Sequence, residues 1–488
     1  MQKQIIRDCL PLVGALLYSY LFTQMHLGVN AFLWAVFILA IIFIFKRETF
    51  RAKYFKLIAF AYFLSALQVV LHHSGLAQVL YVLSFITLVG YTQVRTLRFI
   101  WYGLLLGIGS LMTAPITALH KWRVFDWLPT KTLQPYLPLS IIPLGIGTIF
   151  LSIYYTANPT LAALVDWIIL QLGMSMLDFS WLYLGRVLLG ACIIIALLWP
   201  SLNKHLVGDR EAFWKMNVLR KRKKVAFSFL SQGLKREYNL AVGTLFLLNG
   251  LLLVTNLLDL KYLLHNFAES SATELSSYVH RGTNLLFLAI ALAMVLVLYF
   301  FRRNLHFYPS RSPWLKWLAF IWLIQNGMLA ISVALRNYYY FTNYGLTHLR
   351  IGVFVFLLVV MIGLFYTYQK VEYQKTAYYL FAKTAWAILG VLTITACFNW
   401  DILITKYNLR YTDRDKLDLY YLLGDLSDKN IYLLDGYPLP RTITSSKGIA
   451  YKSEDLLNRK KSTYERRTKQ MDWRHWNLAD ARNRIWRE

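Results

Sequence analysis

Long runs of apolar residues follow one another along most of the chain, separated by short polar segments. A helix needs about 20 mostly apolar residues to cross the hydrocarbon core of a bilayer. This pattern predicts an all-α polytopic membrane protein with a small polar C-terminal extracytoplasmic tail. The runs lie at residues 9–22, 29–45, 57–71, 76–94, 100–118, 137–155, 181–199, 240–257, 285–301, 314–335, 351–366 and 379–398.

The composition favours the same class of protein. Of the 488 residues, 57% are hydrophobic and 16% are charged, a balance that soluble domains do not normally tolerate. Lys3 and Arg7 precede the first run as in a secretory signal, but no A-x-A-like cleavage site follows, so we expect an uncleaved first span. Cys9, Cys192 and Cys397 fall in or beside different runs and form no CxxC pair, which indicates neither a disulfide framework nor a zinc site. We expect no metal and no cofactor.

The net charge of +27 is a topology signal, because Lys and Arg gather in the short loops between the runs. The positive-inside rule places the basic loops 46–53, 204–235, 302–311 and 370–375 in the cytoplasm. Because the positive charge is explained by these loops, we expect no nucleic-acid partner. The loops poor in basic residues then lie outside. The N-terminus is predicted to be cytoplasmic and the tail after residue 398 extracytoplasmic.

These two fixed ends require an odd number of spans, about eleven or thirteen. Either the run 161–177 crosses the membrane, which gives thirteen, or it lies flat at the interface and the glycine-rich run 100–118 does not cross, which gives eleven. The sequence leaves both interpretations open. We divide the chain into N-terminal transmembrane helices, a basic cytoplasmic loop, a C-terminal transmembrane core and an extracytoplasmic tail, at residues 1–200, 201–238, 239–398 and 399–488.

Three amide side chains, Asn249, Gln325 and Asn326, interrupt the later apolar runs. An amide without a partner costs several kcal/mol in hydrocarbon, so these side chains should face other helices or a wet cavity. In one interpretation they join helices, each contributing about 1 kcal/mol. In the other, Gln325 and Asn326 lie low in a ligand pocket.

Charged and aromatic residues gather at the predicted outer ends of the later spans. Arg281, Arg336 and Arg350 lie on the face where positive charge is normally depleted, and a guanidinium pairs well with carboxylate or phosphate. The alternative is that arginine and tyrosine anchor the span ends at the interface. The predicted ligand-binding set is Glu274, His280, Arg281, Asn284, Gln325, Asn326, Arg336, Tyr340, Tyr344, Thr347 and Arg350.

A catalytic interpretation rests on His280 and Glu274, since histidine titrates near neutrality and a carboxylate can orient it. No nucleophile motif, HExxH sequence or phosphate-binding loop accompanies the pair. We therefore assign no catalytic residue.

Three segments resemble those of a known family. The match YVHRG supplies Tyr278, His280, Arg281 and Gly282, and the match ALRNYYYFTNYGLTHLR supplies Ala334, Leu335, Arg336, Tyr340, Tyr344, Gly345, Leu346, Thr347, Leu349 and Arg350. The start of the tail, NWDILITKYN with LDLYYLLGDLS, matches through Asn399, Asp401, Ile404, Asn408, Asp418, Tyr421, Leu422, Leu426 and Ser427.

In these segments, over about residues 240–430, the chain resembles the polytopic bacterial membrane proteins grouped as domains of unknown function 4173 and 4153. It departs from that pattern at Leu275–Ser277, where an Ala-Glu pair is expected, which weakens a carboxylate role for Glu274. Arg281 and Gly282 also lie one residue closer together than in the pattern, and no residue separates Leu335 from Arg336. The resemblance implies a bacterial inner membrane and a shared outer-face constellation, and it implies no activity.

The tail ends in a segment with Trp473, Trp476 and Trp486 among arginines, which suits an interfacial helix or, over residues 456–488, a docking segment for a membrane or periplasmic protein. A solvated helix is the alternative. Three functions remain open. The first is binding or transport of an anionic or hydroxylated envelope-related ligand or lipid through an outer-face pocket, the second is a non-catalytic membrane subunit or scaffold, and the third is an envelope-modifying enzyme.

Overall fold

The computed structural model describes most of the chain, and the longer stretches that it leaves out fall between residues 122 and 311. The described residues are 2–24, 26–121, 158, 160–161, 163–165, 167, 181–199, 211, 216–217, 234–265, 292, 294–301, 312–444, 448–469 and 471–485. The predicted run 137–155 and most of 161–177 and of the basic loop 201–238 lie outside them.

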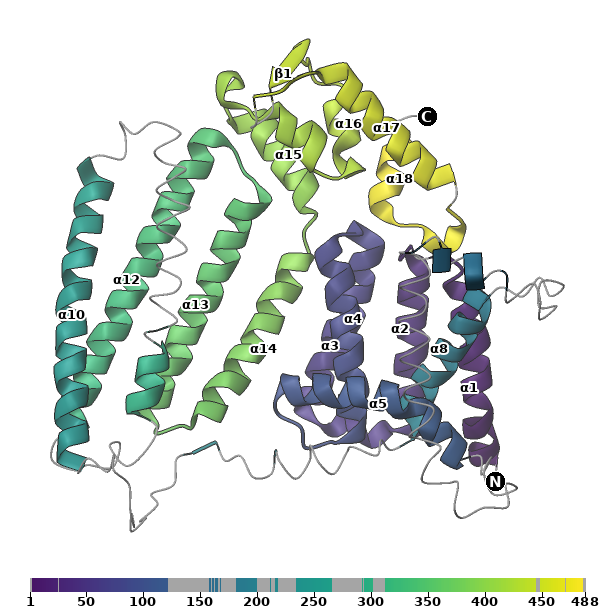
Figure 1. Cartoon of the computed structure of the whole chain (residues 1–488), viewed down its shortest axis with the longest axis horizontal. Helices are drawn as coiled ribbons and strands as arrows, with labels where there is room; N and C mark the ends of the chain where they lie inside the picture. Colours follow the sequence, from purple (N-terminus) through teal and green to yellow (C-terminus); the bar gives the residue numbers. More distant parts are fainter. Residues whose placement is uncertain are drawn as a thin grey trace. The chain divides into compact units, whose positions relative to one another are not determined.

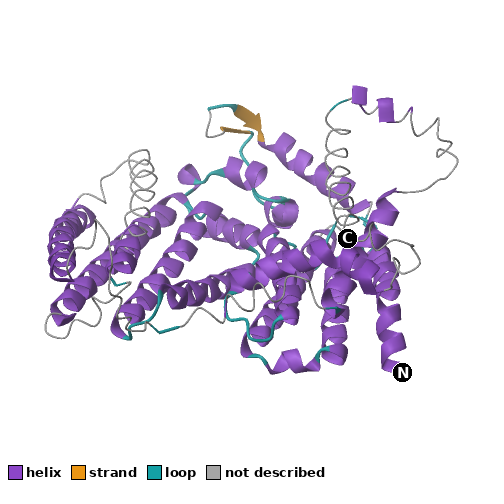
Figure 2. Ribbon diagram, turned by 60° about the horizontal axis from the view of Figure 1, so that its bottom comes forward, coloured by secondary structure: helices purple, strands orange, loops and turns teal. Residues whose placement is uncertain are grey.

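The described part of the chain is almost entirely helical, and its strands form one short hairpin (Figure 2). The hairpin pairs β1 (Thr442–Thr444) with β2 (Ala450–Lys452) in antiparallel register. The long helices are α1 (Gln2–Leu21), α2 (Val29–Phe45), α3 (Lys53–His72), α4 (Gly75–Gln93), α5 (Ile100–Lys121), α8 (Trp181–Leu198), α10 (Leu234–His265), α12 (Ser312–Tyr344), α13 (His348–Glu372) and α14 (Ala377–Ala396). The tail contains α15 (Trp400–Tyr411), α16 (Ile431–Leu434), α17 (Ser453–Lys469) and α18 (Leu478–Ile485).

Seven of the described helices are long and apolar enough to cross a membrane, namely α3, α4, α5, α10, α12, α13 and α14. The helix α2 and the Tyr183–Leu198 part of α8 are shorter apolar helices. The prediction of an all-α polytopic membrane protein is thereby confirmed. The helices α10 and α12, with 32 and 33 residues, extend well beyond the predicted runs 240–257 and 314–335, because a helix continues past the apolar stretch that identifies the span.

The described residues group into two compact units. The first contains residues 1–59, 85–97 and 102–208, with α1 packed on α8. In this unit the end of α4 crosses α5 at glycines: a Cβ on Gly90 or Gly107 would collide with a backbone carbonyl of the other helix. Such contacts let helix backbones approach closely, as is common between spans. In Figure 1, α5 runs crosswise to α1, α2 and α8.

The second unit contains residues 60–84, 98–101 and 209–488. Its long helices pack in chain order, α10 on α12, α12 on α13 and α13 on α14 (Figure 1). Buried apolar side chains fill the space between α10, α12 and α13, among them Leu245, Ala319, Trp322, Val333 and Leu357.

Residues 400–485 of the tail fold into a small unit that we call the tail module. Its apolar core includes Ile404, Leu422, Leu434 and Leu457, and it takes in Ile351 from the first turn of α13. Three residues separate the end of α14 from the start of α15, which is capped by Asn399. The Asn399 side chain accepts a hydrogen bond from the Ile402 amide. Because the core is shared, the tail module is fixed to the end of the helix bundle where α13 begins.

Candidate functional site

Seven residues of the predicted ligand-binding set lie in the described part of the chain. Glu274, His280, Arg281 and Asn284 lie outside it. The seven fall into two groups, one inside the helix bundle and one at the turn between α12 and α13.

The amides inside the bundle connect α10 with α12. Gln325 Nε2 donates to Asn249 Oδ1 over 3.3 Å, and Asn249 Nδ2 donates to the Leu245 and Leu318 carbonyls over 2.8 and 3.0 Å. Asn326 donates to the carbonyl of Trp322 in its own helix over 2.7 Å. Asn249 and Gln325 thus join the two helices, whereas the bond of Asn326 stays within α12.

Arg336 is buried between the same two helices and forms an ion pair with Asp259 of α10. Ser332 Oγ lies 3.2 Å from an Asp259 carboxylate oxygen and 3.3 Å from the guanidinium, so it bonds to both. The charge of Arg336 is therefore neutralised within the bundle. Sequence reasoning missed Asp259 as a partner because the apolar run of α10 ends at residue 257, whereas the helix itself continues to His265.

Arg350 holds the turn between α12 and α13 together. Its guanidinium donates to the carbonyls of Tyr344, over 2.9 Å, and Gly345, and it lies 4.1 Å from the centroid of the Tyr340 ring. Gly345 has a φ of +78°, which is strained for a residue with a side chain. Thr347 caps α13 by accepting a hydrogen bond from the Arg350 amide.

The tail module forms hydrogen bonds with this turn. Asn408 of α15 accepts a hydrogen bond from the Leu346 amide over 2.5 Å and donates to the Leu346 carbonyl over 2.9 Å. The Tyr421 hydroxyl accepts a bond from the His348 amide over 3.0 Å. The start of α13 is thus placed by two segments of the tail module, one in α15 and one in the turn Tyr421–Asp425.

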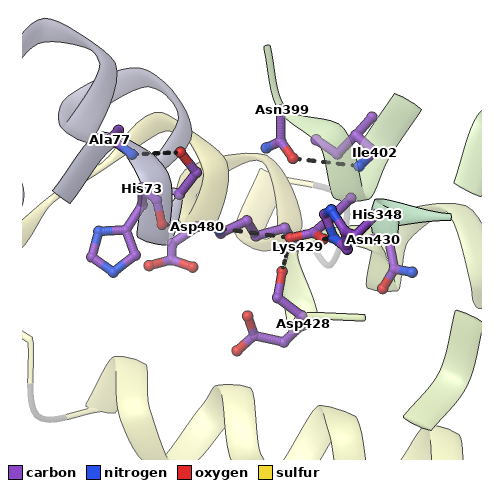
Figure 3. Close-up of polar contacts among 12 residues, drawn as sticks. His73, Ala77, His348, Asn399, Ile402, Asp428, Lys429, Asn430 and Asp480 are labelled. Carbon is purple, nitrogen blue, oxygen red and sulfur yellow. Dashed lines mark hydrogen bonds and ion pairs between the residues drawn. The ribbon is translucent and has the colours of Figure 1, made fainter. Parts of the chain in front are cut away.

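This placement pairs the imidazole of His348, which is labelled in Figure 3, with the carboxylate of Asp401. His348 Nε2 lies 2.7 Å from Asp401 Oδ1, and the other carboxylate oxygen accepts a hydrogen bond from Ser427 Oγ. The side chain of Asp401 is 12% exposed, whereas that of His348 is 51% exposed. The carboxylate is enclosed by the protein, and the imidazole faces outward.

The ionisation of Asp401 follows from its partners. Burial alone would raise the pKa of Asp401, but hydrogen bonds from His348 and Ser427 and the charge of Lys429 hold that pKa below its ordinary value. An ionised carboxylate only accepts hydrogen bonds, so the imidazole must present an N–H at Nε2. This orients the ring and leaves Nδ1 as the second nitrogen, an acceptor when the ring is neutral and a donor when it is protonated.

Lys429 lies beneath the pair and ties the tail module to the turn between α3 and α4. Its Nζ donates to the His73 carbonyl over 2.8 Å (Figure 3) and lies 3.9 Å from Asp401 Oδ2. Deeper in the tail module, Arg467 pairs with Asp428 at 2.9 Å and with Asp480 at 2.5 Å. Among the residues that the structure describes, no group of three or more His, Cys, Asp or Glu side chains is placed to hold a metal ion.

Two of the matching stretches, residues 334–350 and the start of the tail, meet at this place, whereas the YVHRG segment lies outside the described residues. Gly345, Thr347 and Arg350 build the turn, and Asp401, Asn408, Tyr421 and Ser427 meet it from the tail module. His348 was missed by sequence reasoning because it occupies the one position between Thr347 and Leu349 that the resembling pattern leaves open. The signal that pointed here was the match at Asp401 and Ser427.

Comparisons with known proteins agree with that resemblance. A family model described as "Domain of unknown function (DUF4153)" matches residues 56–437, which is more than half of the chain and includes both sides of the His348–Asp401 pair. No curated protein and no solved structure matches the chain. The chain therefore belongs to the DUF4153 family of domains of unknown function.

Proposed function

We propose that this integral membrane protein binds an anionic or hydroxylated ligand of the cell envelope at the His348–Asp401 pair, on the outer side of a bacterial inner membrane. The observation that carries the proposal is the half-exposed imidazole held at 2.7 Å by an enclosed carboxylate. Such a ring offers an oriented donor or acceptor to a ligand without rearranging. Transport of the ligand would use the same contact as its first step.

The arrangement of loops in the second unit supports the outer location. The tail module bonds to the turn between α3 and α4 and to the turn between α12 and α13, and all three were expected outside from the positive-inside rule. At the other end of α13, Lys375 Nζ donates to Asn217, which belongs to the predicted cytoplasmic loop 201–238. The N-terminus would then be cytoplasmic and the tail extracytoplasmic.

Of the two predicted ligand-binding arginines that the structure describes, only Arg350 contributes to this site. Arg336 is neutralised by Asp259, and Arg350 donates to carbonyls of the turn that positions His348. A ligand would therefore meet the imidazole first, and Tyr340, Tyr344 and Thr347 would support the turn around it. The contribution of Glu274, His280, Arg281 and Asn284 stays part of the proposal.

The test compares small molecules that accompany the full-length protein after mild extraction from its own membrane, identified by native mass spectrometry. Wild type is compared with His348→Ala and Asp401→Asn, and His26→Ala, an exposed histidine in the first unit, is the matched control. We expect a bound ligand in wild type and His26→Ala, and a reduction of about tenfold in the two site variants, which corresponds to the loss of about one strong hydrogen bond. Equal ligand content in wild type and His348→Ala would remove His348 from the binding site.

A scaffold function is the second candidate, favoured by the end of the tail module. Trp473 and Trp476 are 55% and 46% exposed, while Arg467 and Arg474 nearby are paired with aspartates. Exposed tryptophans commonly anchor protein interfaces. If this function is correct, a protein partner that co-purifies with wild type is lost from the double variant Trp473→Ala/Trp476→Ala and retained by His348→Ala.

A further inference from the structure

Helix α15 has two faces of different character. Ile404, Thr405 and Asn408 are buried and contact the core of the tail module or the turn between α12 and α13. Leu403, Lys406, Tyr407 and Arg410 follow at the spacing of the opposite face, and Leu403, Lys406 and Arg410 are exposed. The His348–Asp401 pair and the Asn408 contacts use only the buried face.

The exposed face combines cations with aromatic and apolar side chains. Lys406 and Arg410 are four residues apart and so project on the same side of the helix. Within the described residues neither of them forms an ion pair, whereas Arg410 lies 5.3 Å from the centroid of the Tyr411 ring. Leu403 is 41% exposed and Tyr411 is 61% exposed.

This face continues the exposed apolar surface of two membrane-spanning helices. Ile394 near the end of α14 and Phe398 just after it are exposed, and α15 begins at Trp400. On the neighbouring helix α12, Tyr338 is exposed and packs on Phe341, which in turn lies 5.6 Å from the Tyr407 ring. The polar headgroup layer is about 5–8 Å deep on each side of the hydrocarbon, so the start of α15 lies within its reach.

We propose that the exposed face of α15 is a docking surface for anionic phospholipid headgroups. Lys406 and Arg410 contact lipid phosphates, and Leu403, Tyr407 and Tyr411 sit at the boundary between headgroups and acyl chains. Basic and aromatic side chains gather where a helix meets the membrane–water interface, and an anionic lipid surface attracts the basic ones. The surface is separate from the proposed His348 site, which lies on the other face of the helix.

The experiment measures binding of phosphatidylglycerol and of phosphatidylcholine to the detergent-solubilised full-length protein by native mass spectrometry. The test variant is Lys406→Gln/Arg410→Gln. Its matched control is Arg441→Gln/Lys452→Gln, which removes two exposed cations beside and within the β-hairpin of the same tail module. A third variant, Lys406→Arg/Arg410→Lys, keeps both charges.

We expect the test variant to bind phosphatidylglycerol at least tenfold more weakly, since a basic residue near an anionic lipid surface contributes about fivefold. The test variant should bind phosphatidylcholine as wild type does, and the matched control and the charge-retaining variant should bind phosphatidylglycerol as wild type does. Wild-type affinity of the test variant for phosphatidylglycerol overturns the proposal. An equal loss in the charge-retaining variant overturns it as well, because charge would then not decide binding. The proposal also fails if Lys406→Gln/Arg410→Gln loses a bound soluble glycan or a protein partner and not phosphatidylglycerol.

Discussion

The second unit uses the same kinds of polar side chain in two different ways. Between α10 and α12, Arg336, Asp259 and Ser332 bond to one another, and Gln325 bonds to Asn249. Where α13 meets the tail module, Asp401 is enclosed by its partners, but the imidazole that it holds is half exposed. The first group connects two helices, whereas the second presents one side chain outward.

The difference follows from the solvent around each group. Hydrocarbon offers no hydrogen bonds, so a charged or amide group inside the bundle must find partners on neighbouring helices. At the end of the bundle, water and ligands can complete the hydrogen bonds of a side chain that the protein holds from one side only. A position in the membrane therefore favours helix assembly, and a position at its edge leaves a residue available for binding.

The strongest test of this comparison is to remove one member of the Arg336–Asp259 ion pair. In Asp259→Ala the guanidinium stays buried without its carboxylate, and we expect the free energy of unfolding to fall by about 3–5 kcal/mol. Replacing both residues, as Asp259→Leu/Arg336→Leu, should recover most of that loss because no charge then remains buried. Denaturant titration of the full-length protein in mixed micelles measures both. Losses that simply add in the double variant would show that the two side chains act independently.

A second test measures how a charge buried in the tail module changes the free energy of unfolding with pH. Lys460 is buried, donates to the Leu422 carbonyl over 2.8 Å, and has its pKa lowered by burial to about 8. Between pH 8 and about 10.4 the unfolded chain then binds more protons at this lysine than the folded chain, so its contribution to the free energy of unfolding rises with pH. Below pH 8 the cost of burying the charge is present in full.

In Lys460→Met that cost is absent, so the free energy of unfolding of the variant relative to wild type should be higher at pH 7 than at pH 9 by about 1 kcal/mol. Thermal and denaturant unfolding of both proteins at the two pH values measures this change, and Lys452→Met, at an exposed lysine, is the control. A difference that does not change with pH would mean that Lys460 titrates as it does in the unfolded chain.

The apolar runs predicted the helices well, because the free energy of placing a segment in hydrocarbon depends mainly on local composition. The run 29–45 coincides with α2, and most of the other described runs lie within the matching helix. Helix ends were predicted less well, since nothing local stops α12 until Tyr344. The nine residues of α12 beyond the predicted run include Arg336 and Phe341, whose ring lies 5.6 Å from that of Tyr407 in α15.

The candidate site was predictable only in part. Sequence placed Arg336 at the end of one apolar run and Arg350 at the start of the next, and the two residues lie in α12 and α13. Their partners, however, come from the continuation of α10 and from backbone carbonyls. His348 and Asp401 are 53 residues apart, and no local spacing rule relates them. Whether a polar residue is enclosed or exposed depends on such distant partners, so it follows from the fold alone.

The smallest expected effect concerns the amides Asn249 and Gln325, and it tests whether they bond to each other or to water. Asn249→Leu and Gln325→Leu should each lower the free energy of unfolding by about 1 kcal/mol, with a coupling of about 0.6 kcal/mol between them, because one hydrogen bond of 3.3 Å joins the two side chains. Unfolding of the two single variants and the double variant in mixed micelles gives the coupling. If the amides instead lined a wet cavity, water would replace each lost partner and the coupling would vanish. Ligand content measured on the same variants should stay at the wild-type level, whereas His348→Ala lowers it without comparable loss of stability.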